Sequence, residues 1–287
     1  KYTDQNEYVK YFQESINSGV DGDYDKAIKY AQGEFCWLMT DDDLLELNAV
    51  EKVLKKIKKN IDLIIVNSKV FNNDYTKILV ERQLNVKKDI NYSIEKNNFF
   101  PIVGAYLSFI GCVVIRKNLW LSRNREDYFG TTFIHVGVIC QNPPITNIYV
   151  ISEPLILIRY GNAMWTANAF NVWNLMWPKL IWSFDSYSNK EKIIICREFP
   201  YSRISTLLYN KAMGSFDFNQ LRKIKIKKYL WRFYLYGLIV CLIPGPIINF
   251  AFCVFFKLFR KNNEIPLYDL LISKHNKLLT KPYQNIL

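Results

Sequence analysis

Residues 31–43 read AQGEFCWLMTDDD and decide the fold. The glycine ends a helix-like stretch, the apolar run 34–40 predicts a buried strand, and Asp41–Asp43 follow that strand directly. An amphipathic helix is predicted over 44–59 and a second strand over 62–67. Strand–helix–strand alternation is typical of an α/β sheet, in which ligands bind beyond the carboxyl ends of the strands. The three aspartates therefore stand where a ligand is expected.

The rest of the chain alternates between helical and extended patterns. Apolar spacing predicts helices over 5–17, 23–32, 133–140 and 164–183, the last rich in tryptophan, and apolar runs predict strands over 109–115 and 148–158. Pro154 is expected to interrupt the last strand. Residues 72–100 are polar, and we expect them to form a long surface excursion.

Charge is distributed unevenly along the chain. The 287 residues carry a formal net charge of +12, yet residues 1–50 hold four basic and eleven acidic side chains. The acidic N-terminal segment suits a bound cation, and the basic remainder of the chain suits contact with anionic lipid. We therefore expect no nucleic-acid partner. Six cysteines form no C-x-x-C pair and only two histidines exist, which argues against zinc and favours buried, free thiols.

The last third of the chain combines basic and apolar residues. Six basic residues and no acid lie between Leu221 and Arg232, and Phe233–Phe256 carries no charge. The segment 244–246 (Pro-Gly-Pro) divides this run into halves of about 15 Å as helix, against about 30 Å of bilayer hydrocarbon. A re-entrant or interfacial hairpin on the inner membrane surface, with both ends cytoplasmic, fits this pattern. A buried core hairpin or an oligomer contact is the alternative.

Three adjacent carboxylates repel one another unless a cation binds between them. Asp43 could instead cap a helix that begins at Leu44, but capping accounts for one or two carboxylates and not for three. Mg²⁺ or Mn²⁺ is commonly bound by one or two carboxylates together with substrate phosphates. The pattern therefore favours a metal–diphosphate site over simple capping.

Residues 31–43 resemble the A-x-G-E-[YF]-x-W-x-x-x-D-D-D segment of family 2 glycosyltransferases, which have the GT-A fold. Residues 17–19 resemble their N-x-G turn, and residues 111–116, 128–136 and 159–165 are similar to the O-antigen branch that includes abequosyltransferases. The first strand of the family and the second, with its nucleotide-contacting aspartate, have no counterpart in this chain. We therefore expect the first βα units of the fold to be missing before Lys1.

The resemblance implies roles for the acidic cluster. Asp41 and Asp43 match the outer positions of the D-x-D motif, so Asp43 would bind the metal and Asp41 the metal shell or the ribose. Asp42, like Asp41, is predicted to contribute to binding of the nucleotide. Arg159 follows a strand and precedes a turn-prone tripeptide, so it is a candidate clamp for the diphosphate, with a surface arginine as the alternative.

The general base has two candidates. Relatives carry an acidic pair that opens a helix, and Glu126 and Asp127 form such a pair in the matching stretch. A solvated loop that pairs with Arg123 and Arg125 is the alternative interpretation. His135 is the nearest titratable group if the alignment shifts, and a neutral core histidine is its alternative.

These inferences predict an α/β chain with a GT-A (Rossmann-like) mixed sheet and a helical, membrane-associated C-terminal extension. Its parts are a catalytic domain at 1–160, a helical acceptor-side region at 161–220, a basic and apolar hairpin at 221–261 and a tail at 262–287. The expected activity is inverting, metal-dependent transfer of a sugar from a nucleotide-sugar donor to a lipid-linked saccharide acceptor, at the cytoplasmic face of the cell membrane. Two alternatives stay open: a non-catalytic membrane-attached scaffold, and another metal-dependent nucleotide-phosphate enzyme.

Overall fold

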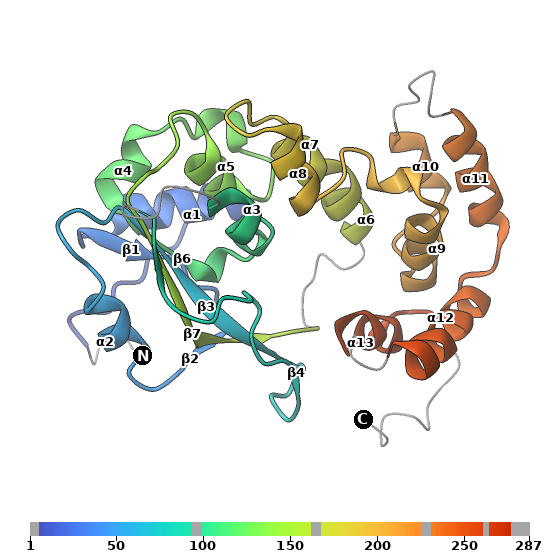
Figure 1. Ribbon diagram of the computed structural model, residues 1–287, viewed down its shortest axis with the longest axis horizontal. Coiled ribbons are helices and arrows are strands. Elements are labelled where there is room, and N and C mark those ends of the chain that lie inside the picture. Colours follow the sequence, from blue (N-terminus) through green and yellow to red (C-terminus); the bar gives the residue numbers. More distant parts are fainter. Residues whose placement is uncertain (1–5, 93–98, 162–167, 225–230, 261–263, 277–287) are drawn as a thin grey trace.

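The computed structural model describes residues 6–92, 99–161, 168–224, 231–260 and 264–276. Figure 1 shows two parts: a sheet with helices on both faces, and a helical group that follows it in the sequence. The two parts meet at one edge of the sheet, where the backbone N–H of Asn73 donates to the Tyr268 hydroxyl.

The sheet is mixed. Its strands lie in the order β1 (Phe35–Trp37), β6 (Val113–Arg116), β3 (Leu63–Phe71), β7 (Ile148–Arg159) and β2 (Leu44–Leu45), while β4 (Ile78–Val80) pairs with β3 and β5 (Ile90–Asn91) pairs with β7. Strands β3 and β7 are parallel, and the other pairs among the described residues are antiparallel. Strands β1, β3 and β7 therefore run in the same direction. The predicted α/β class with a mixed sheet is confirmed.

Side-chain alternation along β3 explains why helices cover both faces. Leu63 and Ile65 belong to one core, together with residues of α1 (Gly19–Tyr30), α3 (Phe99–Val103), α4 (Lys117–Ser122) and α5 (Ile134–Cys140). Ile64 and Val66 belong to the other core, which includes residues of α2 (Ala49–Leu54). All four β3 side chains are fully buried. Burying such a side chain contributes about 1.5–3 kcal/mol, so β3 anchors the sheet.

A bulge bends β3 and β7 at the same level. Their register shifts around Asn67, which lies opposite Pro154. Proline has no N–H to donate, so a strand accommodates it where pairing is interrupted. The side-chain amide of Asn67 donates to the carbonyls of Leu84 and Ser152, both at 2.8 Å. The strand is therefore not broken at Pro154 as predicted: its pairing register shifts there, and β7 continues through Pro154 to the edge that carries the site.

The described residues after β7 form a helical group. Its elements are α6 (Ala169–Asn171), a π turn (Val172–Met176), α7 (Trp177–Trp182), α8 (Asn189–Ile195), a 3-10 turn (Pro200–Ser202), α9 (Ile204–Met213), α10 (Phe218–Lys223), α11 (Trp231–Leu242), α12 (Gly245–Phe259) and α13 (Glu264–Ile272). Phe170 and Trp177 are buried in cores, as expected for aromatics at helical spacing. Trp165, part of the predicted aromatic helix, lies outside the described residues.

Helices α11 and α12 form a bent pair. Their axes meet at 99° across a break at Pro244. Among the described residues no single helix has the length and apolar composition needed to cross a bilayer, and this bent pair meets both criteria only when its two arms are counted together. The predicted break at 244–246 is confirmed.

Three local predictions are wrong or incomplete. Residues 6–17 form no helix; Tyr8 is 87% exposed, because this segment has no core to cover its aromatic face. The helix predicted over 44–59 is confined to α2, because Leu44 and Leu45 pair with β7 and Asn48 adopts a left-handed φ of 65°. The segment 262–287, expected to be a tail, contains α13.

The remaining strand boundaries also shift. The predicted strand 109–115 begins with a 3-10 turn, Ile110–Cys112, after another at Tyr106–Ser108, and becomes extended only at β6. The polar excursion 72–100 contains β4 and β5, which pair with β3 and β7. The helix predicted over 23–32 begins earlier, at Gly19, whose φ of 73° suits glycine.

Candidate active site

The acidic cluster Asp41–Asp43 links β1 to β2 at the edge where β7 ends. Because Leu44 pairs with Leu157, Asp43 lies beside the last residues of β7. The backbone N–H of Arg159 donates to Asp43 Oδ1 at 2.9 Å. Two residues that are 116 positions apart in the sequence are thereby brought together at one edge of the sheet.

Asp43 is the most constrained carboxylate of the cluster. Its Oδ2 accepts a hydrogen bond of 2.5 Å from the Thr40 hydroxyl, so each carboxylate oxygen has one partner. Burial raises the pKa of Asp43, and the negative charges of Asp42 and Asp41 raise it further. The helix-capping interpretation is wrong, because Leu44 is extended and the Asp43 side chain bonds outside any helix. Each oxygen keeps a lone pair for a further ligand.

A tight turn at 72–77 supports the cluster from the neighbouring strand. The hydroxyl of Tyr75 donates to the Asp42 carbonyl at 2.8 Å. Tyr75 has a φ of 61°, a region that non-glycine residues adopt only when their surroundings fix them. Sequence analysis missed this contact and assigned the segment to a surface excursion. Its signal is the turn-prone run Asn72–Asp74 directly after β3.

The same turn orients Arg159. The guanidinium Nε donates to the carbonyl of Asn73 at 2.6 Å, while the Arg159 backbone holds Asp43. Asn73 in turn donates its backbone N–H to Tyr268 of α13 at 3.2 Å. Arg159 is thus fixed between the acidic cluster and the C-terminal helices, which a freely solvated surface arginine would not be.

Helix α1 approaches the cluster from another side. Burial raises the pKa of Tyr24 to about 12, with further contributions from the charges of Asp42, Asp43 and Asp41. The Tyr24 side chain therefore lies within the electrostatic field of all three aspartates. Nothing in the sequence singled out Tyr24, because its proximity depends on how α1 packs on the sheet.

One turn earlier on α1, Asp21 holds the loop that precedes α5. Its carboxylate accepts from the backbone N–H of Thr132 at 2.8 Å and of Ile134 at 2.9 Å. Asp21 is buried, and burial raises its pKa against the lowering effect of these bonds. Asp21 and Tyr24 lie one helical turn apart, so the same helix holds the loop and carries the tyrosine that senses the charges of the acidic cluster.

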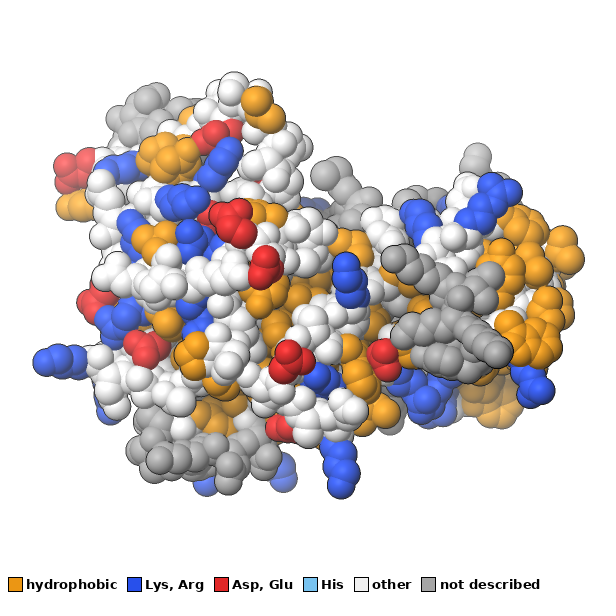
Figure 2. Space-filling view, turned by 90° about the horizontal axis from the view of Figure 1, so that it is seen from above, with side chains coloured by type: hydrophobic (Ala, Val, Ile, Leu, Met, Phe, Trp, Pro, Cys, Tyr) orange, Lys and Arg blue, Asp and Glu red, His pale blue; other side chains and the backbone are white. Residues whose placement is uncertain are grey.

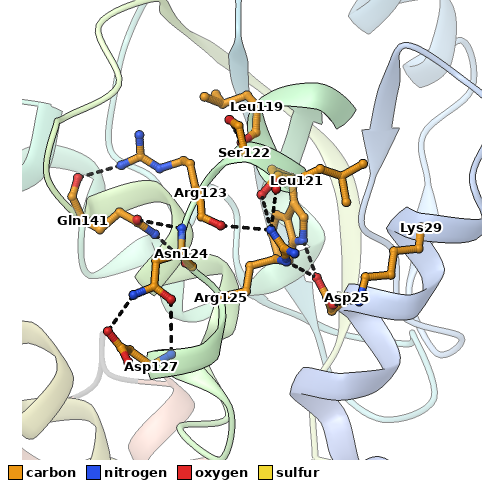
Figure 3. A network of polar contacts seen from close by, with 11 residues as sticks. Asp25, Lys29, Leu119, Leu121, Ser122, Arg123, Asn124, Arg125, Asp127 and Gln141 are labelled. Carbon is orange, nitrogen blue, oxygen red and sulfur yellow. Dashed lines mark hydrogen bonds and ion pairs between the residues drawn. The ribbon is translucent and has the colours of Figure 1, made fainter.

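Glu126 and Asp127 are exposed on the 3-10 turn Glu126–Tyr128. Asp127 Oδ2 accepts from the side-chain amide of Asn124 at 2.6 Å. Figure 3 shows that neighbouring Arg125 points away from this pair toward buried Asp25, with Nε and Oδ1 separated by 2.8 Å.

The pairing proposed for the two loop arginines is wrong. Arg123 donates to the backbone carbonyls of Val138, Gln141 and Pro143, at 2.5, 2.7 and 2.9 Å. Arg125 forms an ion pair with Asp25 and donates to backbone carbonyls at the end of α4. The acidic side chains of the turn are therefore not neutralised by these arginines, and Asp127 stays exposed.

His135 is buried in the core, at 2% exposure. Its Nε2 lies 2.7 Å from the Leu107 carbonyl, an acceptor, so Nε2 carries the proton. Its Nδ1 is buried without a hydrogen-bond partner. Burial lowers the pKa of His135 to about 4. This environment fits the core-histidine alternative, with a neutral imidazole at physiological pH.

Carboxylate oxygens are hard ligands of the kind that Mg²⁺ and Mn²⁺ prefer. Within the described ranges, no group of three or more His, Cys, Asp or Glu side chains is arranged to hold a metal ion. The donor set of Asp41 and Asp43 suits such an ion chemically, and the mutual repulsion that raises the pKa of Asp43 would be relieved by it. An ion held by these two carboxylates would take its remaining ligands from water and phosphate oxygens.

One hollow on the described surface lies elsewhere. It measures about 970 Å³ and lies between residues 8–17 and α1. It contains none of the predicted site residues. Asp41 is exposed, so the acidic cluster belongs to an open edge of the sheet and not to that hollow.

Two comparisons relate the chain to known proteins. Residues 1–120 match the family described as Glycosyl transferase family 2. Abequosyltransferase RfbV of Salmonella typhimurium is similar, with 22% identity over 165 residues that cover 54% of this chain and 50% of the relative. The matched stretch therefore spans about half the length of that curated relative.

The mixed sheet with aspartates at its carboxyl edge fits the GT-A class of α/β domains. Residues 1–120 are thus similar to Glycosyl transferase family 2, and the chain resembles the O-antigen branch of that family. The resemblance first seen in residues 31–43 is thereby confirmed.

Proposed function

We propose that this protein is an inverting glycosyltransferase that moves a sugar from a nucleotide-sugar donor to a saccharide acceptor. The observation that carries the proposal is the placement of Asp41–Asp43 at the carboxyl edge of the sheet, with Asp43 bonded to Arg159. Ligands of open α/β sheets bind at this edge. The match of residues 1–120 to Glycosyl transferase family 2 supports the same reaction class.

We assign Asp43 and Asp41 as ligands of Mg²⁺ or Mn²⁺, with Asp42 and Arg159 on the side of the nucleotide. When bound, the ion supplies positive charge to the leaving diphosphate. The protein itself contributes position: Thr40 and the Arg159 backbone fix the Asp43 carboxylate. The Arg159 guanidinium, oriented by the turn at 72–77, can bind phosphate oxygens as a planar fork.

Asp127 is the better candidate for the base. In the reaction, the acceptor oxygen bonds to the anomeric carbon, the bond from that carbon to the diphosphate breaks, and the acceptor proton moves to a carboxylate. Asp127 is exposed and held by Asn124, whereas His135 is buried. Glu126 is equally exposed and is the second choice. The inverted anomeric configuration follows from this single displacement.

The acceptor is proposed to be a lipid-linked saccharide, used at the cytoplasmic membrane face in surface polysaccharide assembly. The named relative is an abequosyltransferase, which supports the transfer of a sugar. The basic and apolar helices α11 and α12 favour an acceptor that is held at a membrane.

The experiment is a nucleoside-diphosphate release assay with Mn²⁺ and a panel of nucleotide sugars, with and without a lipid-linked saccharide extract. We expect release from one donor, stimulated by the extract. Asp127→Asn is expected to lower the rate roughly a hundredfold or more, the usual contribution of a general base.

Asp185→Asn, an exposed carboxylate between α7 and α8, is the matched control and is expected to retain the wild-type rate. Absence of release from every donor would refute the enzyme and favour the scaffold. Release that continues unchanged in Asp127→Asn would refute the assignment of the base alone.

A further inference from the structure

The outer face of the bent helix pair is apolar and uncovered. On α11 the exposed side chains are spaced three or four residues apart, and α12 repeats the pattern. The exposed set is Trp231, Leu235, Tyr236, Ile239 and Leu242 on α11, and Ile247, Phe250, Val254, Phe255, Leu258 and Phe259 on α12. Figure 2 shows hydrophobic side chains gathered at this end of the molecule. Exposed apolar area of this kind marks an interaction surface.

The inner face of the same pair is fixed to the protein. The side-chain amide of buried Asn249 donates to the carbonyls of Ala212 and Leu270, at 3.2 and 3.0 Å. Lys211 of α9 donates to the Cys241 carbonyl at 3.1 Å, which holds the end of α11. The two helices are therefore attached along one side. These contacts leave the opposite face of the pair exposed.

The stretch of sequence that forms this face carries only basic charges. Between Asp217 and Glu264 the sequence holds nine basic residues and no acidic one. Among the described ones, Lys257 and Arg260 stand at the end of α12, and the Arg232 guanidinium lies 5.6 Å from the Trp231 ring centre. Tryptophan beside a cationic side chain is common where proteins meet lipid headgroups.

We propose that the outer faces of α11 and α12 bind the surface of a bilayer that contains anionic phospholipid, with both helices lying along the interface. The arms measure about 18 and 22 Å, less than the roughly 30 Å of the hydrocarbon core. An amphipathic helix with basic flanks typically sinks only about 5–10 Å into the headgroup boundary.

A second copy of the chain is the competing occupant, and the charges disfavour it. A symmetric dimer would place the same surface patch on both subunits, so its basic borders would face each other. Anionic lipid instead neutralises them, at about 1 kcal/mol for each basic residue near the surface. This inference concerns binding to lipid alone and stands or falls without sugar transfer.

The test is co-sedimentation of the whole chain with phosphatidylcholine vesicles, with and without about 30 mol% phosphatidylglycerol. The wild type is expected to bind the anionic vesicles, and less so at high salt. Ile239→Glu on α11 and Leu258→Glu on α12 are each expected to reduce binding roughly tenfold.

Leu54→Glu on α2 is the matched control, because Leu54 is 59% exposed, against 57% for Ile239 and 62% for Leu258. It should bind as the wild type does. A second variant, Lys257→Gln with Arg260→Gln, leaves the apolar face intact and should weaken the preference for anionic vesicles, because it removes two of the nine basic residues.

Three results would overturn the proposal. One is a wild type that stays in the supernatant with anionic vesicles. Another is glutamate variants that sediment as the wild type does. The third is a wild-type dimer in solution that the same substitutions convert to monomer, with no change in sedimentation.

Discussion

Acidification tests the placement of His135 more sharply than any other perturbation. Burial lowers its pKa from 6.5 to about 4 in the folded protein. Between these values the unfolded chain binds a proton that the folded chain does not, so the free energy of unfolding falls as the pH falls. Because one pKa unit corresponds to about 1.4 kcal/mol, His135 alone accounts for about 3 kcal/mol over the whole range. Below a pH of about 4 no further loss is expected from this group.

The assay is urea unfolding of the wild type and His135→Gln at about pH 7 and about pH 5. Glutamine keeps an N–H that can reach the Leu107 carbonyl but has no basic nitrogen. The wild type should lose about 2 kcal/mol more than the variant between the two pH values. Carboxylates that titrate in the same range are common to both proteins and cancel in the comparison.

Nuclear magnetic resonance gives an independent reading of the same pKa. The chain contains two histidines, so His275→Gln assigns the two imidazole signals without ambiguity. An imidazole of His135 that titrates near its ordinary value, or equal pH dependence in the wild type and His135→Gln, would refute the buried, neutral placement. Either result would also restore His135 as a candidate base.

Three further predictions concern the site and its support. Tyr75→Phe removes the hydroxyl that donates to the Asp42 carbonyl. We expect the free energy of unfolding to fall by about 1 kcal/mol in thermal unfolding, and Mn²⁺-dependent donor binding to weaken in calorimetry. Unchanged donor binding would exclude a positioning role for Tyr75. Asp269 of α13 accepts a hydrogen bond from the Tyr209 hydroxyl of α9 at 3.3 Å. Burial raises the pKa of Asp269 to about 6, so the free energy of unfolding should fall as the pH rises from about 4 to about 6. Asp269→Asn should therefore gain up to about 3 kcal/mol at neutral pH in urea unfolding, and a variant that is less stable at both ends of the range would contradict this. In the release assay Asp127→Asn should lower the rate with donor binding unchanged, while His135→Gln should retain the wild-type rate; the opposite pattern would exchange the two assignments.

The strands were predictable because their signal is local. β3 and β7 are long apolar runs, and burial on both faces leaves no other place for them. The sequence also indicated that Asp41–Asp43 follow a strand at an edge of the sheet. Family resemblance then directed attention to the same residues.

The contacts that complete the site were not predictable, because they join distant segments. Tyr75 reaches Asp42 across 33 positions, and Arg159 reaches Asp43 across 116. Tyr24 approaches the cluster only because α1 packs on the sheet. No spacing rule within a single segment encodes such pairs.

Helical spacing is a poor guide where tertiary pairing, or its absence, decides the local structure. Residues 6–17 have amphipathic spacing but no core to bury it, so no helix forms. Leu44 and Leu45 belong to a helix-like pattern, yet pairing with Ile156 and Leu157 draws them into the sheet. The α13 helix docks against the turn at 72–77 through Tyr268, which its position near the chain end did not indicate.

The central claim is that Asp41–Asp43 form a metal-dependent nucleotide site. Calorimetry with nucleotide sugars, with and without Mn²⁺, measures this most directly in the wild type and in Asp43→Asn. The account predicts donor binding that requires Mn²⁺ in the wild type and is lost in Asp43→Asn, while both proteins unfold at similar urea concentrations. Donor binding that is equally strong without Mn²⁺, or that survives in Asp43→Asn, would contradict it.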